Sequence, residues 1–129
     1  MNKLTIIKNC VCRAREVSPM MLNGKNRKTE IVTARYLCYY FARELTKLTF
    51  QEMGRLIGGK DHATVIHGCK TVENLIFTDK AFAIEVDSIS KDIKKAIDDA
   101  KSQTRRRIYN RYSYNARFNR SATRLTPVL

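Results

Sequence analysis

The sequence predicts an all-α protein. Apolar residues recur every three to four positions along most of the first 100 residues, which is the spacing of one buried helix face. No segment sustains an alternation of apolar and polar residues, and the 129-residue chain holds only two prolines. The apolar fraction of 43% is enough for an ordinary globular core. We therefore expect a bundle of helices joined by short turns.

Two helical segments and a basic loop are expected before residue 29. Residues 3–16 have apolar side chains at helical spacing and are predicted to form an amphipathic helix. A short helical turn follows over residues 18–22, because serine caps a helix and Pro19 suits its first position. Residues 23–28 read NGKNRK. They are predicted to form a loop, since Asn-Gly interrupts regular structure.

A longer helix is predicted over residues 29–46. Its buried stripe is expected to consist of Ile31, Ala34, Leu37, Cys38, Phe41 and Leu45. A second face carries Arg35, Tyr39 and Arg43 at four-residue spacing. This face is either simply solvated or contacts phosphate groups.

A helix, a glycine turn and a further helix follow. Residues 49–57 open with a Thr-x-x-Glu capping box and are predicted to form a short helix. Gly58-Gly59 ends this helix, because glycine adopts the left-handed conformation at low cost. Residues 61–77 are predicted to form the next helix, with Asp61 as its N-cap. A last helix is predicted over residues 79–100. The inward side chains of the short helix are expected to be Phe50, Met53, Leu56 and Ile57.

The charge distribution divides the chain. The formal net charge is +13, from 25 basic and 12 acidic residues, and no acid occurs after residue 100. The helical spacing also fails after Lys101. We predict a helical domain over residues 1–101 and a basic tail over residues 102–129, extended by itself and ordered by a partner.

Several classes of protein are disfavoured. No apolar run approaches the roughly 18 residues of a membrane span. The apolar stretch within the first eight residues is too short for a signal peptide. A cytoplasmic, nucleoid-associated location is therefore expected. We expect no nucleotide cofactor, because the phosphate-binding pattern G-x-x-x-x-G-K-[ST] is absent from these 129 residues. No catalytic set of side chains stands out, so an enzyme is not predicted.

The cysteines are expected to be reduced and buried rather than metal ligands. A structural zinc site needs two pairs of the C-x₂₋₄-C type, and the chain offers no such pairs. We therefore predict no metal. The four residues concerned are Cys10, Cys12, Cys38 and Cys69.

The helix, glycine turn and helix match the layout of a helix-turn-helix DNA-binding unit. A surplus of positive charge attracts polyanions, and a helix N-terminus attracts phosphate. Ala63 and Thr64 are small enough for close approach to a groove floor, and their methyl groups suit a thymine methyl. Asp61 can accept a hydrogen bond from a cytosine amino group. Any helical bundle has such corners, so a purely structural role of this unit is the alternative.

Residues 58–67, GGKDHATVIH, resemble the GG[RK]DHTTVLH signature of the C-terminal DNA-binding domain of the bacterial DnaA replication initiators. The resemblance extends backward without gaps. Residues 30–35, EIVTAR, are similar to the basic helix of that family, and residues 43–46, RELT, follow as they do there. The resemblance covers about residues 3–77. It implies the helix-turn-helix bundle of the DnaA C-terminal domain and binding of its short asymmetric target, the DnaA box.

The resemblance also implies roles for individual residues. Arg27 corresponds to the family's minor-groove arginine, with Lys25 and Lys28 beside it. Arg35 and Arg43 correspond to DNA contacts made from the long helix. The helix start that reads the major groove is expected to comprise Asp61, His62, Ala63 and Thr64, preceded by a phosphate contact from Lys60.

This sequence departs from the family pattern at several places. Ala63 stands where the family has threonine, and Gln51 stands where the family usually has proline. The preferred site is therefore expected to differ from the standard box. The family's ATPase module is not found in these 129 residues, so ATP-driven assembly is not expected.

The predicted function is sequence-preferring binding of double-stranded DNA by a regulator of replication or transcription, of bacterial or phage origin. The tail is expected to add nonspecific nucleic-acid contacts or to bind a protein partner. Its contacting residues are predicted to be Arg105, Arg106, Arg107 and Arg111. The alternative is a structural nucleoprotein or virion assembly component. Binding to an anionic membrane is disfavoured by Asp87, Asp92, Asp98 and Asp99 on the last helix.

Overall fold

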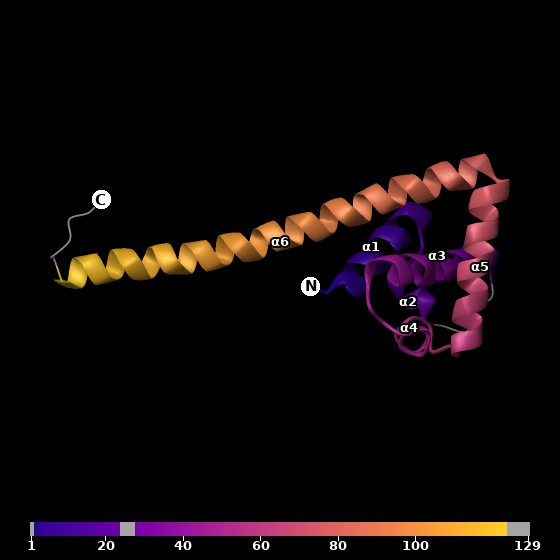
Figure 1. Ribbon diagram of the computed structural model, residues 1–129, viewed down its shortest axis with the longest axis horizontal. Helices are drawn as coiled ribbons and strands as arrows, with labels where there is room; N and C mark the ends of the chain where they lie inside the picture. The colour runs from indigo at the N-terminus through magenta and orange to yellow at the C-terminus, as the bar shows by residue number, and fades with distance from the viewer. Residues whose placement is uncertain (1, 24–27, 124–129) are drawn as a thin grey trace. The chain divides into compact units, whose positions relative to one another are not determined.

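The described part of the chain forms six helices. The computed structural model describes the backbone of residues 2–23 and 28–123 and the side chains of residues 2–23 and 28–106. Within these ranges there is no strand, and the all-α prediction is confirmed. The helices are α1 (Lys3–Arg15), α2 (Pro19–Leu22), α3 (Thr29–Leu45), α4 (Phe50–Leu56), α5 (His62–Thr78) and α6 (Lys80–Thr123) (Figure 1).

The chain divides into two units, Met1–Ala96 and Ile97–Leu129. In the first unit, α3 is the central helix and packs against α1, α2, α4 and α5 (Figure 1). Ala34, Leu37, Cys38 and Tyr39 of α3 are all fully buried. Because four other helices pack against α3, its side chains can hold these helices and the turns between them in place.

A glycine lets α5 approach α3 closely. A Cβ atom at Gly68 would lie 2.7 Å from the ring of Tyr36, which is closer than side-chain carbons approach one another. The ring of Tyr36 also meets the ring of His67 edge-on, with 5.9 Å between their centroids. Gly68 therefore fixes how near the two helices lie.

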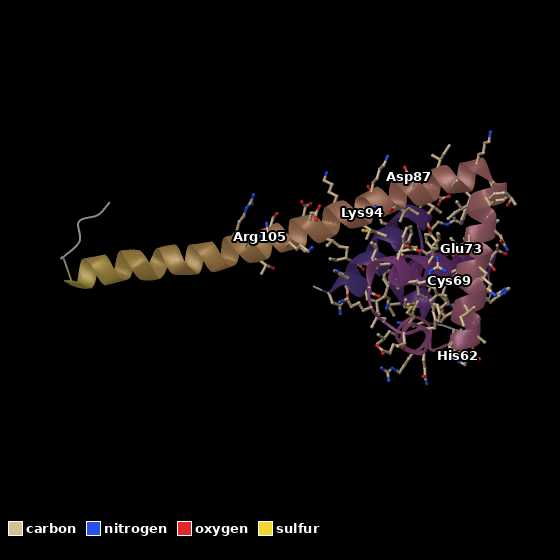
Figure 2. All side chains as sticks on the ribbon, in the orientation of Figure 1. His62, Cys69, Glu73, Asp87, Lys94 and Arg105 are labelled. Carbon is tan, nitrogen blue, oxygen red and sulfur yellow. The ribbon has the colours of Figure 1, made fainter. Side chains whose placement is uncertain are left out.

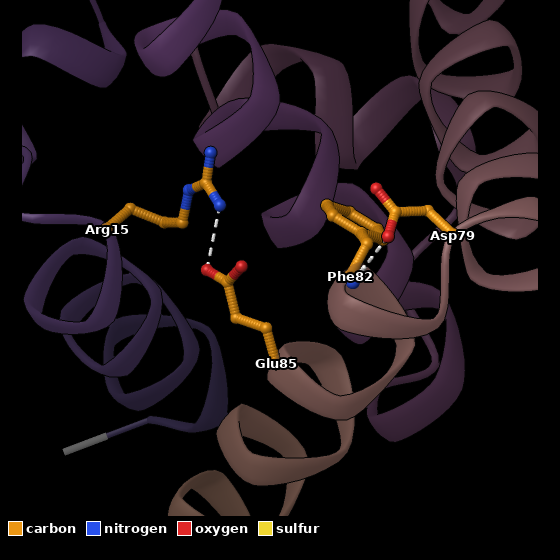
Figure 3. A network of polar contacts seen from close by, with 4 residues as sticks. All are labelled: Arg15, Asp79, Phe82 and Glu85. Carbon is orange, nitrogen blue, oxygen red and sulfur yellow. Dashed lines mark hydrogen bonds and ion pairs between the residues drawn. The ribbon is translucent and has the colours of Figure 1, made fainter.

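The first part of α6 completes the bundle. Its predicted apolar face is buried over Phe82, Val86, Ile89 and Ile93. The helix starts at a cap in which the Phe82 backbone N–H donates to the Asp79 carboxylate, at 3.2 Å (Figure 3).

An ion pair joins α6 to the N-terminal helix within the first unit. The guanidinium of Arg15 lies 2.7 Å from the Glu85 carboxylate (Figure 3). Both side chains are partly exposed, so solvent screens their attraction. The apolar face of α6 therefore contributes more to the attachment of this helix than the ion pair does.

The second unit differs from the sequence prediction. The tail was expected to be extended from residue 102, but α6 continues as one helix to Thr123. Residues 80–123 contain neither glycine nor proline, so nothing in this stretch breaks a helix. Polar composition indicated the lack of a buried face, but it carries no information on backbone conformation.

Three of the cysteines are buried, as predicted, and Cys10 is partly buried. Burial raises the pKa of the Cys12 and Cys69 thiols, which keeps them protonated and unreactive. In the described part of the chain, none of the helices combines the length and apolar character needed to cross a membrane.

Candidate nucleic-acid interface

The helix-turn-helix unit consists of α4, a turn over residues 57–61, and α5. Thr49 caps the first helix as predicted: the Glu52 backbone N–H donates to the Thr49 hydroxyl at 3.1 Å. The Glu52 carboxylate accepts from the same hydroxyl at 3.2 Å, which differs from the backbone contact of a full capping box. Met53 and Ile57 are buried as predicted. The inward placement of Phe50 and Leu56 was wrong, since 36% and 43% of these residues are exposed. A seven-residue helix covers its neighbours with one narrow face, and these two side chains lie at its edges.

The turn between the two helices depends on three glycines. Gly58 and Gly59 have φ values of 85° and 61°, so both adopt the left-handed conformation as predicted. Gly54, in α4, is needed for a different reason. The Lys60 backbone N–H donates to the Gly54 carbonyl at 2.7 Å, and a Cβ at Gly54 would lie 2.1 Å from the Lys60 carbonyl oxygen. The chain returns directly over Gly54 to begin α5.

Two buried side chains of α3 contact this turn or the segment beside it. The Tyr39 hydroxyl donates to the Ile57 carbonyl at 2.9 Å, and the tyrosine is fully buried. Burial raises the pKa of Tyr39 well above its usual range, so the hydroxyl keeps the proton that it donates. Arg35 donates from Nε to the Leu22 carbonyl at 3.0 Å and is only 5% exposed.

The predicted exposed face of α3 therefore does not exist in the expected form. Arg35 and Tyr39 are both buried, because this face of the central helix is covered by α2 and by the glycine turn. The four-residue spacing correctly placed Arg35 and Tyr39 on one side of α3. Their side chains are buried and donate hydrogen bonds to backbone carbonyls instead of being exposed to solvent.

The start of α5 is exposed and rigidly capped. Asp61, His62 and Ala63 are exposed, and Thr64 is partly exposed. Asp61 Oδ1 accepts two hydrogen bonds from Thr64, one from the backbone N–H at 2.9 Å and one from the hydroxyl at 2.7 Å. The predicted cap is thus present. Figure 2 shows His62 on the first turn of the helix, with Cys69 and Glu73 farther along.

The two bonds from Thr64 have a measurable consequence for Asp61. The Thr64 hydroxyl, and then its backbone N–H, lower the pKa of Asp61 from its usual value of 3.8. The cap therefore stabilises the fold above the ordinary aspartate pKa, and this contribution is lost as the pH falls through the lowered value. In Thr64→Val the hydroxyl donor is gone, and we expect the pKa of Asp61 to rise. An NMR titration of the Asp61 carboxyl carbon measures both values, and an unchanged pKa in the variant would contradict this reading.

The basic loop begins beside the glycine turn. Asn23, the last residue before the loop, accepts a hydrogen bond through Oδ1 from the Gly58 backbone N–H at 3.2 Å. Lys28, at the other end of the loop, is exposed and precedes α3. The two predicted contacts Lys25 and Arg27 lie outside the described residues.

Arg43 lies apart from the α5 start. Its guanidinium pairs with Glu73 of α5 and, at 2.9 Å, with Glu44. Glu73 follows His62 by eleven residues, which corresponds to roughly 16 Å along a helix. The structure therefore brings together Lys60 to Thr64 and the start of the basic loop, with Arg35 behind them, but not Arg43.

The tail residues are only partly described. Arg105 and Arg106 are exposed on α6. Arg107 and Arg111 belong to the same helix, but their side chains lie outside the described residues. No group of three potential metal ligands occurs where side chains are described.

Sequence reasoning missed the residues that hold the turn in place. Asn23 was assigned only to a loop, Tyr39 only to a polar face, and Gly54 had no assigned role. A glycine inside a short helix signals a close backbone approach and could have identified Gly54. Nothing in the spacing of Asn23 or Tyr39 indicates their partners, which are distant in sequence.

Comparison with known proteins identifies the same unit. The family described as the bacterial dnaA protein helix-turn-helix matches residues 4–72, more than half of the chain. The chromosomal replication initiator protein DnaA of Flavobacterium psychrophilum is 48% identical over 73 residues, which are 57% of this chain and 15% of the relative. The DnaA of Bacteroides thetaiotaomicron is 40% identical over 85 residues, 66% of this chain and 18% of the relative. That of Thermodesulfovibrio yellowstonii is 39% identical over 90 residues, 70% and 20% respectively.

This chain thus spans a fifth or less of the length of these curated relatives. The matched region contains the Thr49 cap, the glycine turn and the exposed start of α5, all of which the structure brings together. The chain belongs to the bacterial DnaA helix-turn-helix family.

Proposed function

We propose that the protein binds double-stranded DNA with a sequence preference, using the start of α5 to read base edges in the major groove. One observation carries the proposal. Asp61, His62 and Ala63 are exposed at the N-terminus of a helix whose preceding turn is held by backbone and side-chain hydrogen bonds. A rigid helix end with small and polar side chains fits the geometry by which helix-turn-helix units enter the groove.

The cap constrains how each residue can read a base. The Thr64 hydroxyl proton is already donated to Asp61, so Thr64 offers a methyl group and an acceptor. Asp61 uses Oδ1 for the cap, which leaves Oδ2 to accept from a cytosine or adenine amino group. His62 and Ala63 complete the reading surface, His62 through ring nitrogens and Ala63 through a methyl contact with thymine.

The phosphate contacts that position the protein are assigned to Lys60 and to the basic loop. Lys25, Arg27 and Lys28 of this loop follow Asn23, which is bonded to the glycine turn. Arg27 is proposed to enter the minor groove, as in the family. Arg43 is proposed to contribute less than predicted, because two carboxylates already neutralise its charge.

The experiment that tests this function compares two duplexes of equal length, one with a DnaA box and one with the same bases scrambled. Affinity is measured for the full chain over a range of salt concentrations. We expect the box to bind at least about tenfold tighter at every salt concentration, because one base contact alone is worth about that much. Equal binding to both duplexes would overturn the proposal.

The basic part of α6 is proposed to add affinity without sequence information. In Arg105→Gln/Arg106→Gln we expect both duplexes to bind more weakly by the same factor. The slope of log affinity against log salt should fall by about one per lost phosphate contact. The double variant Lys91→Gln/Lys95→Gln, exposed on an earlier part of α6, is the matched control. A change in the ratio between duplexes would show that the tail reads bases, and unchanged binding would exclude the contact.

The biological role is proposed to be regulation of replication or transcription without ATP hydrolysis. The relatives are named as chromosomal replication initiators, but only their helix-turn-helix portion is matched by this chain. A second candidate is a structural nucleoprotein component. The continuous basic helix after residue 100 favours it, and equal affinity for both duplexes together with strong salt dependence would select it.

A further inference from the structure

Two hydrogen bonds meet at the end of α2, one from the turn that precedes α5 and one from α3. Asn23 accepts from the Gly58 backbone N–H, and Arg35 donates from Nε to the carbonyl of Leu22, the residue before Asn23. The same Arg35 lies against Gly58, because a Cβ atom at Gly58 would be 2.9 Å from Arg35 Nε. Leu22, Asn23, Arg35 and Gly58 therefore form one connected cluster, which we call the brace.

The brace is built to hold one geometry. Gly58 is buried and has a φ of 85°, so its N–H points away from the helical hydrogen-bond pattern. A buried N–H without a partner is unfavourable, and the Asn23 side chain supplies an acceptor at 3.2 Å. Leu22 is fully buried, which fixes the carbonyl that Arg35 contacts. Each member is thus oriented by another member.

The position of the brace links two parts of the candidate interface. Gly58 lies three residues before Asp61, the N-cap of α5. Asn23 is the residue from which the basic loop departs. Loss of the bond between Asn23 and Gly58 therefore releases the end of α2 from the turn that precedes the exposed α5 start.

We propose that Asn23 and Arg35 are positioning residues for sequence discrimination, which act through Gly58 and do not themselves touch bases. This inference rests on the proposed function and deepens it. Asn23 sets the orientation of the glycine turn, and buried Arg35 locks the carbonyl end of α2 against the same turn. The α5 start is thereby held at one angle to the chain segment that enters the basic loop.

The test replaces the acceptor and measures discrimination. In Asn23→Ala we expect the ratio of affinities for the box and scrambled duplexes to fall by about fivefold or more, the low end of losing one base contact. The affinity for the scrambled duplex should stay nearly unchanged, because phosphate contacts tolerate small rotations. The Gly58 amide should also exchange faster with solvent, which NMR records without DNA.

A conservative variant separates positioning from simple stability. Asn23→Asp retains the oxygen that accepts from Gly58, so the ratio should return to the wild-type value. The added negative charge should lower both affinities together. Asn2→Ala is the matched control, because it also removes an asparagine acceptor of a backbone N–H, that of Thr5 at 2.8 Å, away from the turn. This control should leave the ratio unchanged.

The possible outcomes distinguish this inference from the function on which it rests. If the wild-type chain binds both duplexes equally, the proposed function fails. If the wild-type chain discriminates but Asn23→Ala retains the full ratio, the brace has no positioning role. If Asn23→Ala lowers both affinities in proportion to its loss of folded protein, the role is structural and the inference is overturned. Arg35→Met, which keeps an unbranched apolar chain as far as the position of Nε but removes the guanidinium, should lower the ratio as well, and a retained ratio in this variant would remove Arg35 from the proposal.

Discussion

In His62→Ala, the affinity for a DnaA-box duplex is expected to fall by about 1–3 kcal/mol, a factor of roughly 5 to 150. His62 is exposed on the first turn of α5, where no intramolecular packing requires its ring. The affinity for the scrambled duplex should change little, since an exposed side chain that reads bases adds little to nonspecific binding. Fluorescence anisotropy titrations with both duplexes measure the two affinities.

The second histidine of the same helix provides the control. His67 is also exposed, but it lies five residues later and its ring meets Tyr36 edge-on. His67→Gln should keep the ratio of the two affinities. Equal loss of ratio in both variants would show that the effect comes from helix stability, and retention of the ratio in His62→Ala would remove His62 from the reading surface.

In Gly54→Ala, the free energy of unfolding is expected to fall by about 2 kcal/mol. Alanine favours a helix over glycine by about 1 kcal/mol, so helix propensity alone predicts the opposite sign. The new Cβ, however, would lie 2.1 Å from the Lys60 carbonyl oxygen, a backbone atom that cannot rotate away. Overpacking of this kind costs about 3 kcal/mol, which exceeds the gain in propensity. The melting temperature should fall by roughly 8–16 °C in a domain of this size.

Gly59 gives a matched comparison on the same turn. No atom lies within 4 Å of a Cβ at Gly59, and its φ of 61° is one that asparagine tolerates. Gly59→Asn should therefore cost less than about 1 kcal/mol. Thermal unfolding followed by circular dichroism orders the two variants. A Gly54→Ala protein as stable as the wild type would mean that α4 and α5 are not held in contact at this point.

The helices and their ends were predictable from local rules. Thr49 with Glu52 and Asp61 with Thr64 form caps within four residues, and Gly58-Gly59 adopts the backbone conformation that only glycine favours. Such features depend on neighbours in the sequence. For this reason the glycine turn and the Asp61 cap at the start of α5 were predicted correctly.

The support of the turn was not predictable from local rules. Tyr39 meets Ile57, and Asn23 meets Gly58, across 18 and 35 residues of sequence. A polar residue on a helix is assigned to solvent by its type, yet Arg35 and Tyr39 are buried because their polar atoms find carbonyl partners. The helical state of residues 102–123 was missed for a different reason, since composition reports on burial and not on backbone conformation.

The anchoring of the glycine turn separates two tasks that a DNA-contacting helix must perform. Tyr39, Asn23 and Gly54 hold the backbone from the protein side, while His62 and Ala63 face outward and bond to none of these three. The outward pair can therefore be exchanged while the scaffold beneath them is retained. A library randomised at these two positions should yield folded proteins whose target sites differ, which makes the domain a suitable starting point for reprogramming.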